Sequence, residues 1–170
     1  MHRNFAWSRP AMAALLVAAS ATTLSAQSTA QVQADEIDAI ETRAMDNLKD
    51  LDRWDRAASL FRRAADLRPA GDPVAVQDLI QAARLSFYTG DEGRAVRDFE
   101  AAGQRAVAMG DVIVAANAFA DAAWVANTRG FGARAHDLLN RAQLLATSPL
   151  IPEDVRDHLM TRWSATGPQQ

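Results

Sequence analysis

Cysteine is absent from the 170-residue sequence, which excludes disulfides, thiolate metal sites, cysteine lipidation and thiol catalysis. Excess charge of one sign is also small, because the formal net charge is −3, and this disfavours nucleic acid as the main ligand. Hydrophobic residues make up 49% of the chain and charged residues 23%, proportions that are ordinary for a globular protein. The composition therefore favours a folded chain that binds something other than nucleic acid.

Residues suited to catalysis or metal binding are few. His136 and His158 lack a second ligand at helical spacing, so they predict no metal site. The acidic run 46–55 lacks the central glycine and final glutamate of a calcium loop. The glycine pair in 130–132 follows no predicted strand, and no serine has the context of a nucleophile elbow. We expect no enzyme activity, no metal and no cofactor.

The N-terminus has the three-part pattern of a secretory signal peptide. Residues 1–10 carry basic side chains and no acid, 11–19 are apolar, and 20–26 are mostly small. The alternatives are an uncleaved anchor and a buried N-terminal helix, but the apolar run is shorter than the ~20 residues that a membrane span needs. The pattern predicts a signal peptide over 1–26 and export to the periplasm or the medium.

Cleavage is predicted after Ala26, with Ser28 and Ala30 as open alternatives. The segment that follows, 27–34, is polar and small, and we expect it to form a tether. No further stretch of the chain is apolar enough to predict a membrane span.

Two stretches, Leu79–Ala102 and Phe119–Ala142, align without gaps at a separation of forty residues. Gly90 aligns with Gly130, and glycine allows a helix to stop abruptly because it adopts positive φ at little cost. Each stretch predicts a helix, a reversal at the glycine and a second helix. The shared alanines predict close helix approach, and Phe99 and Leu139 are expected to fill the space beside them; the aligned alanine pairs are Ala82 with Ala122, Ala83 with Ala123, Ala95 with Ala135 and Ala102 with Ala142.

Apolar residues at spacings of three and four predict seven helices in the exported part. Their expected bounds are about 35–51, 54–68, 73–88, 92–108, 111–129, 132–146 and 152–163. The expected fold is an all-α solenoid of three hairpins over 35–149, with a capping helix and a short tail. Val155, Leu159 and Trp163 share one side of the last helix and would cover the end of the stack. The charged residues of that helix, Arg156 among them, are expected to stay solvated. The predicted units are the repeats 35–71, 72–110 and 111–149, the capping helix 150–164 and the tail 165–170.

These hairpins resemble the tetratricopeptide repeat family, whose pattern ends in alanine, a phenylalanine four residues later, a small residue and a proline. Ala57, Phe61, Ala64 and Pro69 match that half of the pattern. The repeat spacing of 38 to 40 residues is longer than the family's usual 34. Another α-solenoid with repeats of about 40 residues therefore remains an alternative.

The resemblance implies a concave groove, lined by the first helix of each hairpin, that holds a peptide or a partner's helix. The stripe beside the packing face of each first helix supplies the candidate residues, and it includes the Trp, Tyr and Arg types that often dominate interfaces. Packing of Trp124 and Tyr88 between hairpins is the alternative, and Phe87 is expected to belong to the core rather than to the groove. The candidate partner-binding residues are Gln77, Gln81, Arg84, Tyr88, Asn117, Asp121, Trp124 and Thr128.

Three functions follow from these expectations. The first is an exported scaffold or adaptor that binds a protein or peptide partner through the groove. The second is a structural subunit of a cell-envelope assembly, or a homo-oligomer, that uses its outer faces, because three hairpins are near the minimum for a stable stack. The third, an enzyme or small-molecule binder, would need a closed pocket with convergent polar groups.

Overall fold

The computed structural model describes the backbone of residues 11–166 and the side chains of residues 29–161 and Trp163. This part contains seven α-helices, one turn of 3-10 helix and no strand, which confirms the all-α class. The chain divides into two units, with the boundary between Asp38 and Ala39. The elements are α1 (Ala11–Asn47), η1 (Leu51–Arg53), α2 (Trp54–Leu67), α3 (Pro73–Tyr88), α4 (Glu92–Ala108), α5 (Val112–Thr128), α6 (Gly132–Ala146) and α7 (Glu153–Thr166).

The described part of the first unit is the N-terminal portion of α1. Of the predicted signal peptide, residues 1–10 lie outside the described residues, and so do the side chains of 11–26, so export stays a prediction. Residues 27–34, expected to form a tether, are instead helical. No glycine or proline interrupts α1, and the Gln31 amide donates to Asp35 one turn later at 2.8 Å. No helix in the described residues combines the length and apolarity that crossing a membrane requires.

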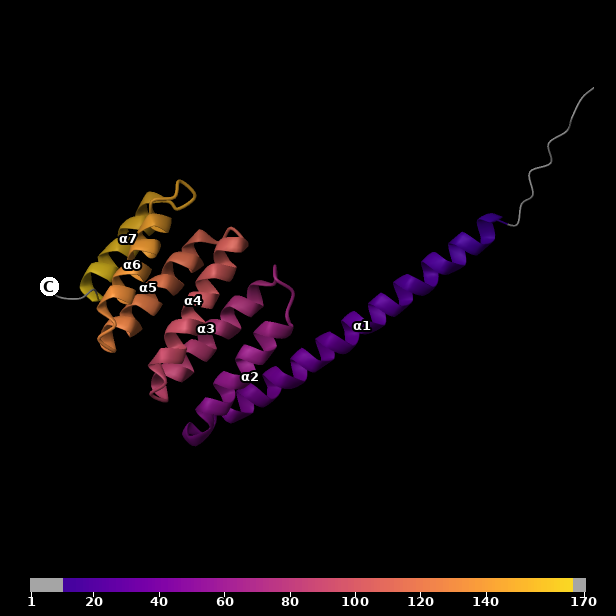
Figure 1. The fold of residues 1–170 in the computed structure, drawn as a ribbon, viewed down its shortest axis with the longest axis horizontal. Coiled ribbons are helices and arrows are strands. Elements are labelled where there is room, and N and C mark those ends of the chain that lie inside the picture. Colours follow the sequence, from indigo (N-terminus) through magenta and orange to yellow (C-terminus); the bar gives the residue numbers. More distant parts are fainter. Residues whose placement is uncertain (1–10, 167–170) are drawn as a thin grey trace, which may run out of the picture. The chain divides into compact units, whose positions relative to one another are not determined.

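In the second unit, the helices from α2 to α6 each pack against the next one, and α7 packs against α5 and α6 (Figure 1). Consecutive helices run antiparallel because turns of about three residues connect α3 to α4, α4 to α5 and α5 to α6. This serial packing is consistent with an α-solenoid. The predicted bounds of α3, α4 and α6 are confirmed.

Three of these turns share one geometry. Gly90, Gly110 and Gly130 have φ values of 85°, 78° and 76°. The residue after each glycine donates its N–H to a carbonyl five positions earlier, at 2.8 to 2.9 Å, as in a Schellman motif. Asp91 and Asp111 then cap the next helix, with their carboxylates accepting from backbone N–H groups at 3.0 and 3.1 Å. The predicted reversals at Gly90 and Gly130 are confirmed.

The first hairpin lacks such a glycine, and its turn differs from the prediction. The first helix was expected to run to Leu51, but α1 ends at Asn47. Asp50 instead accepts from the backbone N–H of Asp52 at 3.1 Å and starts η1. The Trp54 indole donates to the carbonyl of Leu48 at 3.1 Å and ties the start of α2 to this turn.

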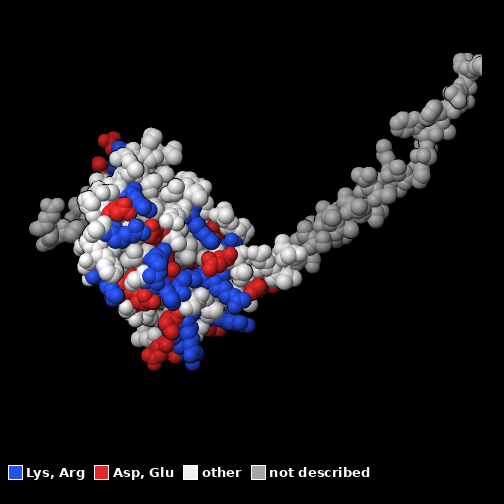
Figure 2. All heavy atoms as spheres, in the orientation of Figure 1, with Lys and Arg blue, Asp and Glu red and all other residues white. Residues whose placement is uncertain are grey.

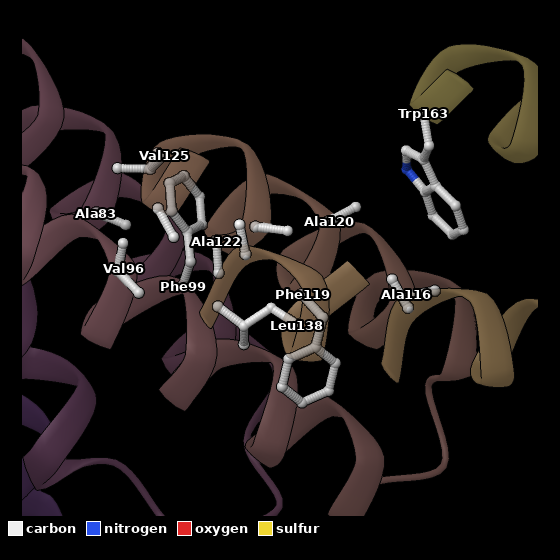
Figure 3. Packing of buried hydrophobic residues seen from close by; sticks show 14 of the residues in the cluster. Ala83, Val96, Phe99, Ala116, Phe119, Ala120, Ala122, Val125, Leu138 and Trp163 are labelled. Carbon is white, nitrogen blue, oxygen red and sulfur yellow. The ribbon is translucent and has the colours of Figure 1, made fainter. Parts of the chain in front are cut away.

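Alanine forms much of the core between neighbouring helices. Ala57, Ala82, Ala95, Ala102 and Ala142 are fully buried, which confirms their predicted packing positions. In Figure 3 the Phe99 and Phe119 rings lie among the small side chains of the core cluster, and Trp163 extends from α7. The small residues set the helix separation, and a few large ones fill the space that remains.

Two details of the core differ from the prediction. Leu139 is only half-buried, and its neighbour Leu138 is the fully buried leucine of α6. Leu159 and Trp163 of α7 are buried as expected. Arg156 of α7, expected to be solvated, is half-buried and donates to the carbonyls of Ala146 and Ile151 at 2.9 and 3.2 Å.

Two arginines of the α2 region join neighbouring helices through largely buried aspartates. Arg68 donates to Asp78 of α3 at 3.0 Å, to Asp72 at 2.9 Å and also to Glu41 of α1. Arg62 donates to Asp98 of α4 at 2.9 Å. Burial raises the pKa of Asp78 to about 6 despite the neighbouring Arg68, and burial also raises the pKa of the Asp98 carboxyl.

Gly103 tests the close approach of α4 and α5. A Cβ on Gly103 would lie 3.0 Å from Cζ of Phe119, which is only 4% exposed and cannot easily move. We expect Gly103→Ala to lower the free energy of unfolding by about 1–3 kcal/mol, although alanine is the better helix former by about 1 kcal/mol. Gly93→Ala in the same helix is the control, since its Cβ would meet nothing closer than 3.8 Å. Equal stability of the two variants in urea denaturation would contradict the tight contact.

Asp78 makes stability depend on pH. Its pKa is about 6 in the folded state, above the ordinary aspartate value of 3.8, so the folded chain binds more protons between these values and stability falls as pH rises through the interval. Between about pH 4.5 and 7.5 we expect Asp78 to contribute a fall of about 1–2 kcal/mol, which Asp78→Asn would remove. Urea denaturation across this range measures the difference, with Asp66→Asn, an exposed aspartate of α2, as control. Parallel pH courses for parent and Asp78→Asn would contradict the assignment.

Candidate functional site

A hollow of about 140 Å³ lies between α3 and α5, with α4 behind it. Its lining is mainly aromatic and aliphatic, with one cationic and one anionic side chain. We call it the α3–α5 hollow, and its lining residues are Arg84, Phe87, Tyr88, Phe99, Asp121, Trp124 and Val125.

The helical repeat explains how these side chains converge. On α3, Arg84 and Tyr88 are four residues apart and therefore share one side of the helix, while the neighbouring Ala83 is fully buried. On α5, Trp124 lies forty residues after Arg84, at the equivalent position of the next hairpin, and Asp121 lies about one helical turn before Trp124. Ala122 and Ala123 are buried behind them, so the polar stripe of each helix faces the hollow.

Aromatic rings form a continuous path beside and within the hollow. The ring centroids of Trp54 and Tyr88 are 5.9 Å apart, those of Tyr88 and Phe87 are 5.7 Å apart, and those of Phe87 and Trp124 are 5.0 Å apart. Each pair is tilted or edge-on, with interplanar angles of 56° to 65°. Such tilted and edge-on pairs are favourable geometries for aromatic rings, so the four rings stabilise one another in this arrangement.

The polar groups of the hollow are mainly donors. Arg84 is exposed, and its guanidinium forms no ion pair or hydrogen bond with any residue that the structure describes. The Tyr88 hydroxyl and the Trp124 indole N–H likewise have no acceptor within the described residues. Tyr88 is 69% exposed and Trp124 is 40% exposed. Asp121 is half-buried and is the one acidic side chain that lines the hollow.

The structure brings four of the eight candidate residues together and leaves four apart. Arg84, Tyr88, Asp121 and Trp124 line the same hollow. The other four do not line it. Gln77 and Gln81 are exposed on α3, Asn117 donates to the carbonyl of Ile113 at 3.1 Å, and Thr128 donates to the carbonyl of Val125 at 2.7 Å.

Three lining residues were missing from the sequence-based set. Phe87 was predicted to belong to the core, and it does pack against the core cluster, but it also lines the hollow. Phe99 forms the hollow from α4, and Val125 follows Trp124 on α5. Their apolar character signalled burial, and only the relative placement of three helices shows that their edges reach this surface.

The carboxyl groups whose pKa is raised by burial lie outside the lining of the hollow. They belong to Asp78 and Asp98. Within the described residues, no group of three or more acidic or histidine side chains is placed to hold a metal ion. An aromatic lining with a few hydrogen-bonding groups suits recognition of a side chain.

Comparison with known proteins gives no assignment: no family model matches the chain, and neither curated proteins nor solved structures yield a match.

Trp124 and Tyr88 differ from core aromatic residues in a measurable way. Since Trp124 is 40% exposed and contacts Phe87, we expect Trp124→Ala to lower the free energy of unfolding by only about 1–2 kcal/mol. Tyr88→Ala should cost less than about 1 kcal/mol. The comparison is Phe99→Ala, a 4% exposed residue for which about 3–5 kcal/mol is expected. A loss for Trp124→Ala as large as that for Phe99→Ala would assign Trp124 to the packing between hairpins.

Proposed function

We propose that this chain is an exported adaptor, similar to tetratricopeptide repeat proteins, that binds a peptide segment or protein partner through the α3–α5 hollow. The observation that carries the proposal is the convergence of Arg84, Tyr88, Asp121 and Trp124 around one partly apolar hollow. Trp, Tyr and Arg are the side-chain types most often found as interface hot spots. Export rests on the three-part pattern of residues 1–26.

The size of the hollow supports recognition of a side chain rather than of a cofactor. Small-molecule sites usually enclose ~300–1,000 Å³, which is larger than the hollow of about 140 Å³. A cavity of ~150 Å³ accommodates a benzene-sized ring. One large side chain of a partner would therefore fill it, with further contacts along the neighbouring surface.

A second candidate function is self-assembly or incorporation into an envelope assembly through outer faces. Leu144, in the last turns of α6, is 74% exposed, and Leu150, in the following loop, is 70% exposed. Exposed leucines near one end of the stack would suit contact with another subunit.

Peptide display tests the first candidate. The folded full chain is used to select binders from a random peptide library, and the selected pool is then tested against variants. Trp124→Ala is expected to reduce retention of the pool by at least ~10-fold, since hot-spot truncation commonly costs 2 kcal/mol or more. Phe131→Ala is the matched control, because Phe131 is a 50% exposed aromatic residue that does not line the hollow.

Equal retention by the parent and Trp124→Ala would contradict binding at the hollow. Loss of retention with Leu144→Ala or Leu150→Ala, and not with Trp124→Ala, would favour the second candidate.

A further inference from the structure

The aromatic side chains of the described residues divide into two groups. Phe61, Phe99, Phe119 and Trp163 are buried, with 4% to 6% exposure. The remaining group lies at the C-terminal ends of α3 and α5 and at the turns or helix starts beside them. None of its members is buried, and they are Trp54, Phe87, Tyr88, Trp124 and Phe131. The core thus uses one set of rings, and a second set collects at one end of the helices.

Most hydrogen-bonding groups at the hollow are donors, and this limits the kinds of ligand that would match them. Arg84, Tyr88 and Trp124 all offer donors, and none of these donors has an acceptor among the residues that the structure describes. Asp121 is the single acidic side chain of the lining. A matching ligand would present several acceptors, few donors and an apolar ring or branched side chain.

A proline-rich segment has this combination. Proline has no backbone N–H but keeps its carbonyl as an acceptor, and its ring is apolar. In the polyproline II conformation the segment forms no internal hydrogen bonds, so its carbonyls remain available, and little ordering entropy is lost on binding. Aromatic-lined grooves are the surfaces on which such segments dock.

We propose that the α3–α5 hollow and its aromatic path bind a proline-rich segment of a partner protein in the polyproline II conformation. This inference rests on the proposed function. One proline ring inserts into the hollow against Phe87 and Trp124, and the neighbouring carbonyls accept from Arg84 and Tyr88. The path toward Trp54 receives the next residues of the segment.

Other occupants fit the surface less well. A strongly acidic segment would pair with Arg84 but would also face Asp121 and an apolar lining. An anionic membrane would favour a patch of like-charged cations, yet Arg84 is the one cationic side chain of the lining, and Arg129 at the end of α5 is paired with Glu92 at 3.0 Å. On the face shown in Figure 2, basic and acidic side chains are intermingled. A second copy could offer the proline-containing segments 69–73 and 149–152, but Pro73 is the first residue of α3 and Ile151 is buried.

The experiment uses the full isotope-labelled chain and a fluorescent proline-rich peptide of about twelve residues, long enough to span the ring path at ~3.1 Å per residue. Fluorescence anisotropy gives the affinity, and the Trp124 indole N–H resonance, assigned with Trp124→Phe, reports occupancy of the hollow. The comparison probes are the same peptide with alanine at every proline, an acidic peptide, and anionic phospholipid vesicles.

We expect the proline-rich peptide to bind at least ~10-fold more tightly than its alanine counterpart and to shift the Trp124 resonance. Arg84→Met keeps the apolar stem and removes the donors, and Tyr88→Phe removes only the hydroxyl; each should weaken binding about three- to tenfold. Both side chains are exposed, so these variants keep the test valid even if Trp124→Ala fails to fold. Phe131→Ala should change the affinity by less than about twofold.

Equal binding of the proline and alanine peptides would overturn the inference. Preference for the acidic peptide or the vesicles would overturn it too, and so would self-association that light scattering detects and Trp124→Ala removes. If display selects peptides without proline, and if their binding depends on Trp124, the proposed function stands and only the proline preference fails. Where no peptide depends on Trp124, both fail.

Discussion

Close approach of helices at fully buried alanines is the constraint on which the second unit depends. Ala82, Ala95, Ala102 and Ala122 leave so little volume between neighbouring backbones that each interface has room for few large side chains. Phe99 and Phe119 take that room, and Gly103 lies directly against the Phe119 ring. Because such a core is filled by a small number of aromatic residues, the other rings of the described chain are available to the surface.

The glycine turns bring the ends of α3 and α5 together beside the hollow. Gly90 and Gly130 end α3 and α5 in the same way, so the last turns of both helices lie at the same end of the helices. Tyr88 and Trp124 lie in or near those last turns, and α4 between them contributes Phe99 as the back of the hollow. The third turn differs by one residue: Phe131 replaces the capping aspartate and stays exposed, with Arg129 5.9 Å above its ring.

Periodicity and turn residues were enough to predict the helices from α3 to α6, because each begins at a capping residue or follows a glycine reversal. Periodicity and turn residues did not predict the features that tertiary contacts determine. Leu138 and Leu139 are equally apolar, and only the rotation of α6 against α5 selects Leu138 for the core. Arg156 reads as a surface residue, yet its long stem lets it satisfy the C-terminal carbonyls of α6. Four of the eight candidate residues line the hollow, because helical spacing predicts which residues share a stripe but not which part of the stripe adjoins a hollow between helices.

The arginines of the second unit differ in whether they form contacts that stabilise the fold. Arg62, Arg68 and Arg105 each reach across a helix interface to a carboxylate or a backbone carbonyl, and their removal would leave buried acceptors without a partner. Arg84 has no such role, because it forms no ion pair or hydrogen bond with the described residues and lies beside an aromatic hollow. A guanidinium without a partner among the described residues, next to an exposed tryptophan and an exposed tyrosine, supports the proposal that this surface contacts a ligand.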